Sequence, residues 1–178
     1  MNNDIKEVLY SGDELKDKIR QMGAKISNDY LGKELILIGI LKGSVIFMSD
    51  LLKEITIPCK MDFMAVSSYG NSTESSGVVR ILKDLDFEIQ GKDVLIVEDI
   101  IDSGVTLKYL MKCLRARKPN SLEIICLLNK PERRKVDIDV KYLGFDVPDY
   151  FLVGFGMDYA EKYRNLPYVG VLKDEIYK

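Results

Sequence analysis

Three short runs of apolar residues constrain the fold of this chain more than any other feature. They are "LILIGIL" (35–41), "VLIV" (94–97) and "LEIICLL" (122–128). Such runs are typical of strands that are buried on both faces, as in a parallel sheet. A stretch with helical spacing precedes the first run, over residues 11–32, and two more lie between the runs, over residues 43–55 and 106–117. Strands that alternate with helices predict an α/β fold, with a mostly parallel, twisted sheet flanked by helices on both faces.

Weaker signals complete the pattern. Ser11 and Glu14 have the spacing of a capping box at the start of the first helix. Residues 61–69 and 78–85 are expected to form two further strands. The polar, glycine-flanked segment 70–77 between them lacks any periodicity and is expected to form a loop.

The 178 residues are expected to form a single domain, because no internal repeat and no linker is visible. After about residue 145 the pattern becomes short, aromatic-rich and irregular. We therefore expect a core over about residues 12–145 and a small hood lobe formed by residues 1–11 and 146–178.

Composition excludes several classes of function. The net charge of −2 argues against a nucleic-acid binder that depends mainly on electrostatics. No apolar run approaches the length of a membrane span, and the polar start is unlike a signal peptide, so a cytoplasmic protein without membrane contact is expected. The chain has no histidine, so acid–base chemistry must use carboxylates, Lys or Tyr. Cys59, Cys113 and Cys126 lack metal-ligand spacing and are expected to be buried free thiols.

The stretch "VLIVEDIIDSGVTL" (94–107) carries the strongest sign of a binding site. A buried strand runs into Glu98, Asp99 and Asp102, although carboxylates are almost never fully buried without a partner. In open α/β sheets, ligands bind beyond the carboxyl ends of the strands. The small-residue turn that follows offers backbone N–H groups to an anion, and the hydroxyls of Ser103 and Thr106 add donors.

Two interpretations of these acids are open. In the first, Asp102 and Ser103 only cap the next helix and the carboxylates face water. In the second, the ligand is a phosphate that also presents sugar hydroxyls or a divalent cation, because three acids would repel a bare phosphate. The full pattern after an apolar strand favours the second interpretation, a phosphorylated ribose with a metal ion. No P-loop sequence is present, and the one G-x-G, at Gly154 and Gly156, lacks the third glycine of a dinucleotide site.

The same stretch resembles the phosphoribosyl-diphosphate-binding motif of the type I phosphoribosyltransferases. Its Glu-Asp pair is similar to the 6-oxopurine branch, hypoxanthine-guanine phosphoribosyltransferase. Further segments resemble that family in the expected order, over nearly the whole chain: "GILKGSVIFMSDL", "SSYG", "LLNK" and "FLVGFGMDYAEKYRNLPYVGVL". The resemblance implies transfer of a 5-phosphoribosyl group from its diphosphate to N9 of hypoxanthine or guanine. The products would be IMP or GMP and pyrophosphate, and the cofactor would be Mg²⁺.

The resemblance also implies roles for the residues of the motif. Glu98 and Asp99 would engage the ribose hydroxyls, directly or through Mg²⁺, and Asp158 would lie in the metal and purine region. Asp102 would be the base near N7 of the purine. The cradle for the 5-phosphate would be formed by Asp102, Ser103, Gly104, Val105 and Thr106.

The remaining implied contacts concern the pyrophosphate and the purine. The residues that would bind the pyrophosphate are Lys42, Gly43, Arg164, Ser68 and Tyr69. A cis peptide would follow Leu41, and Ser68 and Tyr69 would head a loop that closes over the reacting centre. The purine would be bound by Lys130 at its 6-oxo group, by stacking on Phe151, by the backbone of Leu152 and by Asp158. The run Arg133, Arg134 and Lys135 is interpreted as solvated.

Other functions remain open at this point. The same fold serves nucleotide-sensing regulators that bind RNA or DNA, but a regulator would need a basic face, whereas this chain is slightly acidic. Xanthine or a pyrimidine would be an alternative base. The expected partners are the two small-molecule substrates and further copies of the chain, as a homodimer or homotetramer. The tail "GVLKDEIYK" is short, so the range of purines is less firmly predicted than the reaction.

Overall fold

The computed structural model describes residues 1–68 and 79–178 of the chain. Its central six-stranded sheet consists of β2 (Leu35–Leu41), β3 (Cys59–Ser68), β4 (Val79–Lys83), β5 (Asp93–Ile101), β6 (Ser121–Asn129) and β7 (Tyr142–Asp146). The strand order is β4-β3-β2-β5-β6-β7. Neighbouring strands are parallel except for β3 and β4, which are antiparallel. This sheet confirms the predicted fold class.

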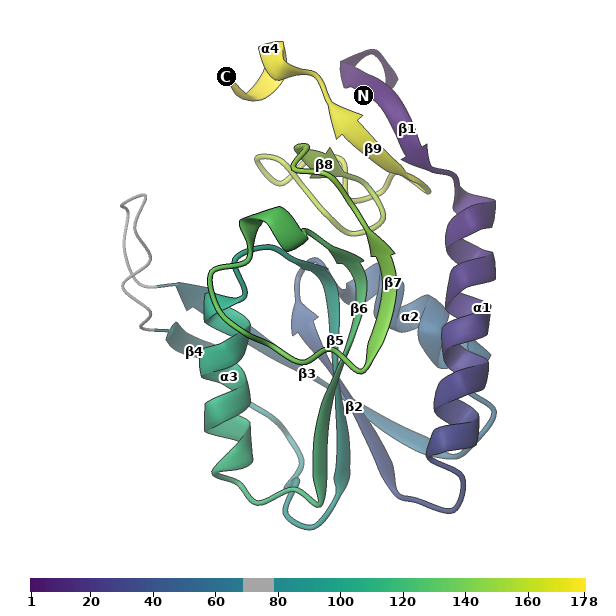
Figure 1. The fold of residues 1–178 in the computed structure, drawn as a ribbon, viewed down its shortest axis with the longest axis vertical. Helices are drawn as coiled ribbons and strands as arrows, with labels where there is room; N and C mark the ends of the chain where they lie inside the picture. The colour runs from purple at the N-terminus through teal and green to yellow at the C-terminus, as the bar shows by residue number, and fades with distance from the viewer. Residues whose placement is uncertain (69–78) are drawn as a thin grey trace.

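Helices cover both faces of the central sheet, as Figure 1 shows. The helices α1 (Gly12–Asp29) and α2 (Val45–Glu54) lie on one face, and α3 (Val105–Arg115) lies on the other. Successive strand residues point to opposite faces, so that Leu37 packs with α1 and α2 whereas Ile38 packs with α3. Burial on both faces explains why the central strands are continuously apolar.

The two ends of the chain meet in a second, three-stranded antiparallel sheet. It contains β1 (Ile5–Tyr10), β9 (Val169–Leu172) and β8 (Leu152–Val153), in that order, with a short 3-10 turn, η1 (Asn2–Asp4), before it. The last helical turn, α4 (Asp174–Tyr177), follows β9. This sheet lies beyond the carboxyl ends of the parallel strands, at the top of Figure 1, where an α/β fold binds its ligands.

Local signals in the sequence account for several element ends. Ser11 Oγ accepts a hydrogen bond from Glu14 N–H at 3.3 Å, and a Glu14 carboxylate oxygen accepts one from Ser11 N–H at 2.8 Å. The capping box is therefore confirmed. The strand β5 is longer than its apolar run, so Glu98 and Asp99 belong to the strand and do not start a loop.

Some expectations differ from the structure. The edge strand β7 was not predicted, because only its first residue is buried and its residues form no long apolar run. All three cysteines are free, but only Cys126 is buried, while Cys59 and Cys113 are partly exposed. The predicted loop 70–77 lies outside the described residues. Among the residues described, no helix has the length and apolar character needed to cross a membrane.

Candidate active site

A cleft opens where the carboxyl ends of the central strands meet the small sheet. It encloses about 380 Å³, which lies within the range of small-molecule sites. The lining comes from the ends of β2 and β5, the residue after β6, and the segment from β8 onward. It includes many of the residues implied by the resemblance: Lys42, Gly43, Glu98, Asp99, Asp102, Lys130, Phe151, Leu152, Asp158 and Arg164.

Two neighbouring acids at the end of β5 form the floor of the cleft. Burial, and then the charge of Asp99, raises the pKa of Glu98 well above its ordinary value. Burial also raises the pKa of Asp99 to about 6, although backbone N–H groups and Arg164 act in the opposite direction. Since burial penalises both charged forms, a cation bound beside them would be favoured. A Cβ atom at Gly43 would lie 2.0 Å from Asp99 Oδ2, so glycine is needed for this close approach.

The turn before α3 forms a smaller hollow beside the cleft, of about 170 Å³, lined by Asp102, Ser103, Gly104 and Thr106 among others. Gly104 has a φ of +79° and begins the helix without a side-chain cap of its own. The backbone N–H groups of the first turn are therefore available to an anion such as phosphate. Val105 N–H donates to Ser103 Oγ at 3.4 Å, a contact that a bound anion would have to replace, and Val105 lines a different groove rather than this hollow.

The two cations predicted for pyrophosphate share a carboxylate partner. Lys42 Nζ lies 2.9 Å from Glu161 Oε2, and Arg164 Nη2 lies 3.4 Å from Glu161 Oε1. Arg164 also pairs with Asp158 Oδ1 at 2.9 Å. The hydrogen bond and charge of Lys42 lower the pKa of Glu161. The peptide bond between Leu41 and Lys42 is cis, as the resemblance implies. Sequence reasoning missed Glu161, because nothing in its local sequence marks it.

Lys130 and Phe151, which the resemblance assigns to the purine, both line the cleft. Lys130 is buried, and its Nζ donates to the Tyr150 carbonyl at 2.7 Å and lies 3.5 Å from Asp149 Oδ1. An ammonium has three donors, so one remains for a ligand. The ring of Phe151 stacks against that of Tyr177, a contact that sequence reasoning also missed.

Comparisons with known proteins agree with this geometry. The family described as "Phosphoribosyl transferase domain" matches residues 7–160. Hypoxanthine-guanine phosphoribosyltransferase from Streptococcus agalactiae is 56% identical over 177 residues, which cover 99% of this chain and 98% of that protein. The Bacillus subtilis enzyme of the same name is 53% identical, over 100% of this chain and 99% of its own.

Solved structures show the same relationship. The crystal structure of a hypoxanthine phosphoribosyltransferase from Staphylococcus aureus matches with a TM-score of 0.98 and 54% identity, over 100% of this chain and 97% of that one. A Trypanosoma cruzi hypoxanthine phosphoribosyltransferase variant, solved as a ternary complex with substrates, matches with a TM-score of 0.94 and 37% identity, over 99% and 100% of the two chains. The chain belongs to the hypoxanthine-guanine phosphoribosyltransferases.

One expectation for this phosphoribosyltransferase was correct only in part: Arg133 and Lys135 are exposed, as a solvated run predicts, but the run also makes specific contacts. The run at Arg133 is not simply solvated, because Arg133 Nε lies 2.7 Å from Asp102 Oδ1 and Arg133 Nη1 lies 3.3 Å from Asp149 Oδ1. Arg134 donates to Asn129 Oδ1, and the backbone N–H of Lys135 donates to the Ser103 carbonyl at 3.0 Å. The segment after β6 therefore folds over the phosphate turn, which the run of charges alone did not indicate.

The described residues hold no group of three or more acids, cysteines or histidines that could by itself bind a metal ion. Of the three acids implied as metal ligands in this phosphoribosyltransferase, Asp158 is paired with Arg164, while Glu98 and Asp99 remain together at the end of β5. Ser68 is the last residue of β3, and its side chain is not described. Tyr69 lies outside the described residues.

Proposed function

We propose that the protein transfers a 5-phosphoribosyl group from phosphoribosyl diphosphate to N9 of hypoxanthine or guanine. The products are IMP or GMP and pyrophosphate, which makes the reaction a step of purine salvage. The observation that carries the proposal is the cleft itself, where an acidic pair, an anion-binding turn, two cations and a buried lysine converge. The names of the relatives support the same reaction.

The donor fits along one edge of the cleft. The 5-phosphate binds at the start of α3, where Ser103 and Thr106 add hydroxyl donors to the backbone N–H groups. The ribose hydroxyls reach Glu98 and Asp99. Lys42 and Arg164 bind the diphosphate, and its phosphates replace Glu161 as their partner. Gly43 brings the backbone of the loop after β2 close to the same group.

We further propose Mg²⁺ as the cofactor, held by Glu98 and Asp99, with Asp158 close by. The buried acidic pair with raised pKa values fits this ion, because a bound cation offsets the cost of ionising both groups. Two carboxylates suffice for this ion, because Mg²⁺ commonly takes one or two carboxylates and completes its shell with substrate oxygens. When bound, the ion supplies positive charge that stabilises the departing pyrophosphate.

The purine binds on the opposite side of the cleft. The third donor of Lys130 points to the 6-oxo group, Phe151 stacks on the ring, and the backbone of Leu152 contacts its edge. Asp102 accepts the proton from N7 as N9 attacks C1′ of the ribose. The bond to pyrophosphate breaks with positive charge building up on the sugar, as in glycoside cleavage, and the nearby acids stabilise that charge.

The proposal also covers the domain organisation, the cellular location and the oligomeric state of the protein. The protein acts as one functional domain, to whose site both sheets contribute. Its core spans residues 12–145, and its hood consists of residues 1–11 and 146–178. Free cysteines fit a cytoplasmic location. Exposed large apolar side chains, such as Met61, Leu82 and Phe87, are available to a homodimer or homotetramer interface.

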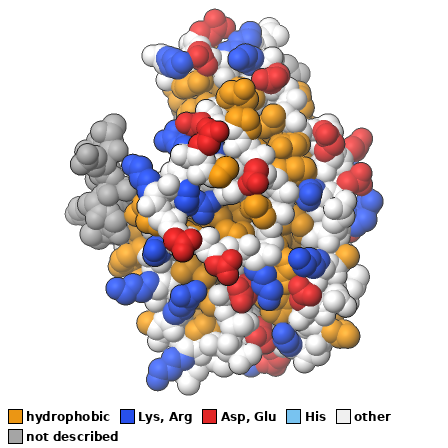
Figure 2. Space-filling model, viewed as in Figure 1, with side chains coloured by type: hydrophobic (Ala, Val, Ile, Leu, Met, Phe, Trp, Pro, Cys, Tyr) orange, Lys and Arg blue, Asp and Glu red, His pale blue; other side chains and the backbone are white. Residues whose placement is uncertain are grey.

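Nothing observed favours the regulatory alternative. Acidic and basic side chains are interspersed on the face shown in Figure 2, which offers no broad basic surface to RNA or DNA. The proposed function is tested by incubating the protein with phosphoribosyl diphosphate, Mg²⁺ and hypoxanthine. Formation of IMP and pyrophosphate in equal amounts is expected. A properly folded protein that forms neither product would contradict the proposal.

A further inference from the structure

Four charged side chains of alternating sign lie in a row along one side of the cleft. Arg133 Nε lies 2.7 Å from Asp102 Oδ1, and Arg133 Nη1 donates to Asp149 Oδ1 at 3.3 Å. The same oxygen of Asp149 lies 3.5 Å from Lys130 Nζ. The order is therefore Asp102, Arg133, Asp149 and Lys130. This row of charges connects the acid proposed to act at N7 with the lysine proposed to bind the 6-oxo group.

The contact at Asp102 differs from an ordinary surface ion pair. Asp102 Oδ1 is buried and makes no hydrogen bond within the described structure, although the side chain as a whole is 46% exposed. Arg133 therefore covers one carboxylate oxygen, which leaves Oδ2 to a ligand. The guanidinium of an arginine is planar, so contacts with two carboxylates fix its orientation more strongly than they would fix a lysine ammonium.

The side chains in this row stabilise one another in their charged forms. The charge of Asp102, followed by contacts with Asp149, raises the pKa of Arg133. Burial tends to raise the pKa of Asp149, but Arg133 and Lys130 outweigh it and hold that pKa below its ordinary value. Asp149 therefore stays ionised and remains a shared anion for both cations.

We propose that Arg133 is a positioning residue for phosphoribosyl transfer. It fixes the carboxylate of Asp102 so that Oδ2 faces N7 of the purine, and Asp149 couples this orientation to Lys130. The inference rests on the proposed function, because Asp102 must be the group that accepts the N7 proton. Arg133 itself touches no substrate and acts through Asp102.

A double-mutant cycle tests this role. Arg133→Met and Asp102→Asn are made singly and together, and single-turnover rates are measured with hypoxanthine, so that product release does not hide the chemical step. Arg133→Met is expected to lower the rate about 10–100-fold when Asp102 is present, since misplacing a catalytic group has costs of this order. In the Asp102→Asn background the further loss should be less than about twofold, because coupled residues are not additive.

Matched variants separate positioning from stability. Arg133→Lys retains the charge but not the planar fork, and should recover only part of the rate. Arg20→Met removes another exposed arginine, which pairs with Asp17 at 3.0 Å on α1, and should leave the rate unchanged. Arg133→Gln replaces Arg133→Met in the cycle if the methionine variant does not fold.

The outcomes are distinct. Equal losses in both backgrounds, or no loss when Asp102 is present, would overturn the role of Arg133 while leaving the proposed function intact. If the unmodified protein formed no nucleotide from any 6-oxopurine, the proposed function would fail and the inference would fail with it. A loss confined to the background that retains Asp102 would support both.

Discussion

The ring of Tyr177 stacks on the ring of Phe151, with the centroids 4.6 Å apart and the planes 28° from parallel. Tyr177 belongs to α4, the last turn of the chain, and its hydroxyl donates to Asp174 Oδ1 at 2.9 Å. Phe151 lines the cleft and is the ring proposed to stack on the purine. The short tail therefore reaches the site and supports the ring on which the purine is proposed to stack.

Tyr177→Ala should weaken purine binding. An aromatic pair contributes about 0.5–1.5 kcal/mol beyond its buried area, so the KM for hypoxanthine should rise by roughly 2–10-fold. The KM for phosphoribosyl diphosphate should not change, and Tyr177→Phe, which retains the ring, should behave like the unmodified protein. Steady-state kinetics with each substrate varied in turn measure this. An unchanged KM for hypoxanthine in Tyr177→Ala would show that the stack has no part in purine binding.

Asp102→Asn should slow the chemical step. The amide cannot accept a proton from N7, and a positioned acid–base group contributes about 10²–10⁴-fold. Binding of phosphoribosyl diphosphate should be largely retained, because the backbone of the phosphate turn is unaltered. Single-turnover rates and donor affinity measure the two effects. A single-turnover rate equal to that of the unmodified protein would remove Asp102 from the role of base.

Activity should require a divalent metal ion. Lys42 and Arg164 alone do not neutralise a diphosphate, so excess chelator should abolish turnover, and added Mg²⁺ should restore it. Glu98→Ala and Asp99→Ala should weaken binding of the donor more than binding of free purine. Titration calorimetry with each ligand, with and without Mg²⁺, provides the measurement. Full turnover in excess chelator would rule out the metal.

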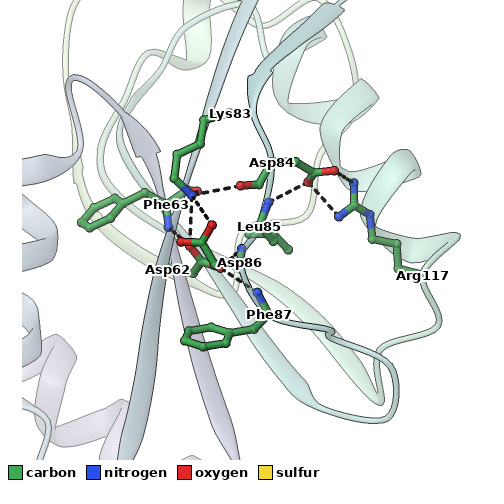
Figure 3. A network of polar contacts seen from close by, with 8 residues as sticks. All are labelled: Asp62, Phe63, Lys83, Asp84, Leu85, Asp86, Phe87 and Arg117. Atoms are coloured by element: carbon green, nitrogen blue, oxygen red, sulfur yellow. Dashed lines mark hydrogen bonds and ion pairs between the residues drawn. The ribbon is translucent and has the colours of Figure 1, made fainter.

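Asp62 in β3 should be important for stability, as the contacts in Figure 3 indicate. Its buried carboxylate accepts backbone N–H groups from Phe63, Asp86 and Phe87 and pairs with Lys83. Asp62→Ala removes these bonds, at a cost of about 2–4 kcal/mol. For a chain of this size, the Tm should fall by roughly 5–15 °C.

Asp86→Asn is the matched control for this prediction. The Asp86 carboxylate pairs with the same lysine at 3.4 Å but is 73% exposed, so its loss should cost about 1 kcal/mol or less. Thermal unfolding followed by circular dichroism compares the two variants. Equal Tm values for Asp62→Ala and the unmodified protein would refute a stabilising role for the buried carboxylate.

The sequence predicted those features that local pattern determines. The strand β2 was predicted with its observed bounds, because its residues from Leu35 to Ile40 are buried and its large side chains there pack alternately into the two core clusters on either face of the sheet. The edge strand β7 was missed because half-exposed strands carry no comparable apolar run.

Contacts between distant segments could not be predicted in the same way. Glu161 lies 119 residues from Lys42 in the chain, and only the folded hood brings the two together. Arg133 was interpreted as solvated because a run of charges usually is, and its partner Asp102 comes from a different strand end. The site residues that were predicted from the sequence were identified through recognisable motifs and not through geometry.

The rate with adenine, compared with that for hypoxanthine and guanine, tests the central claim most directly. Lys130 presents only donors, which match the 6-oxo acceptor, whereas the 6-amino group of adenine is itself a donor. Sites built on such a hydrogen bond reject the mismatched analogue by about 10⁴–10⁵, so kcat/KM for adenine should be lower by at least about a thousandfold. Lys130→Gln should narrow this gap, mainly by lowering kcat/KM for the two 6-oxopurines. If the unmodified protein used adenine as well as hypoxanthine, the account of Lys130 and of 6-oxopurine transfer would be contradicted.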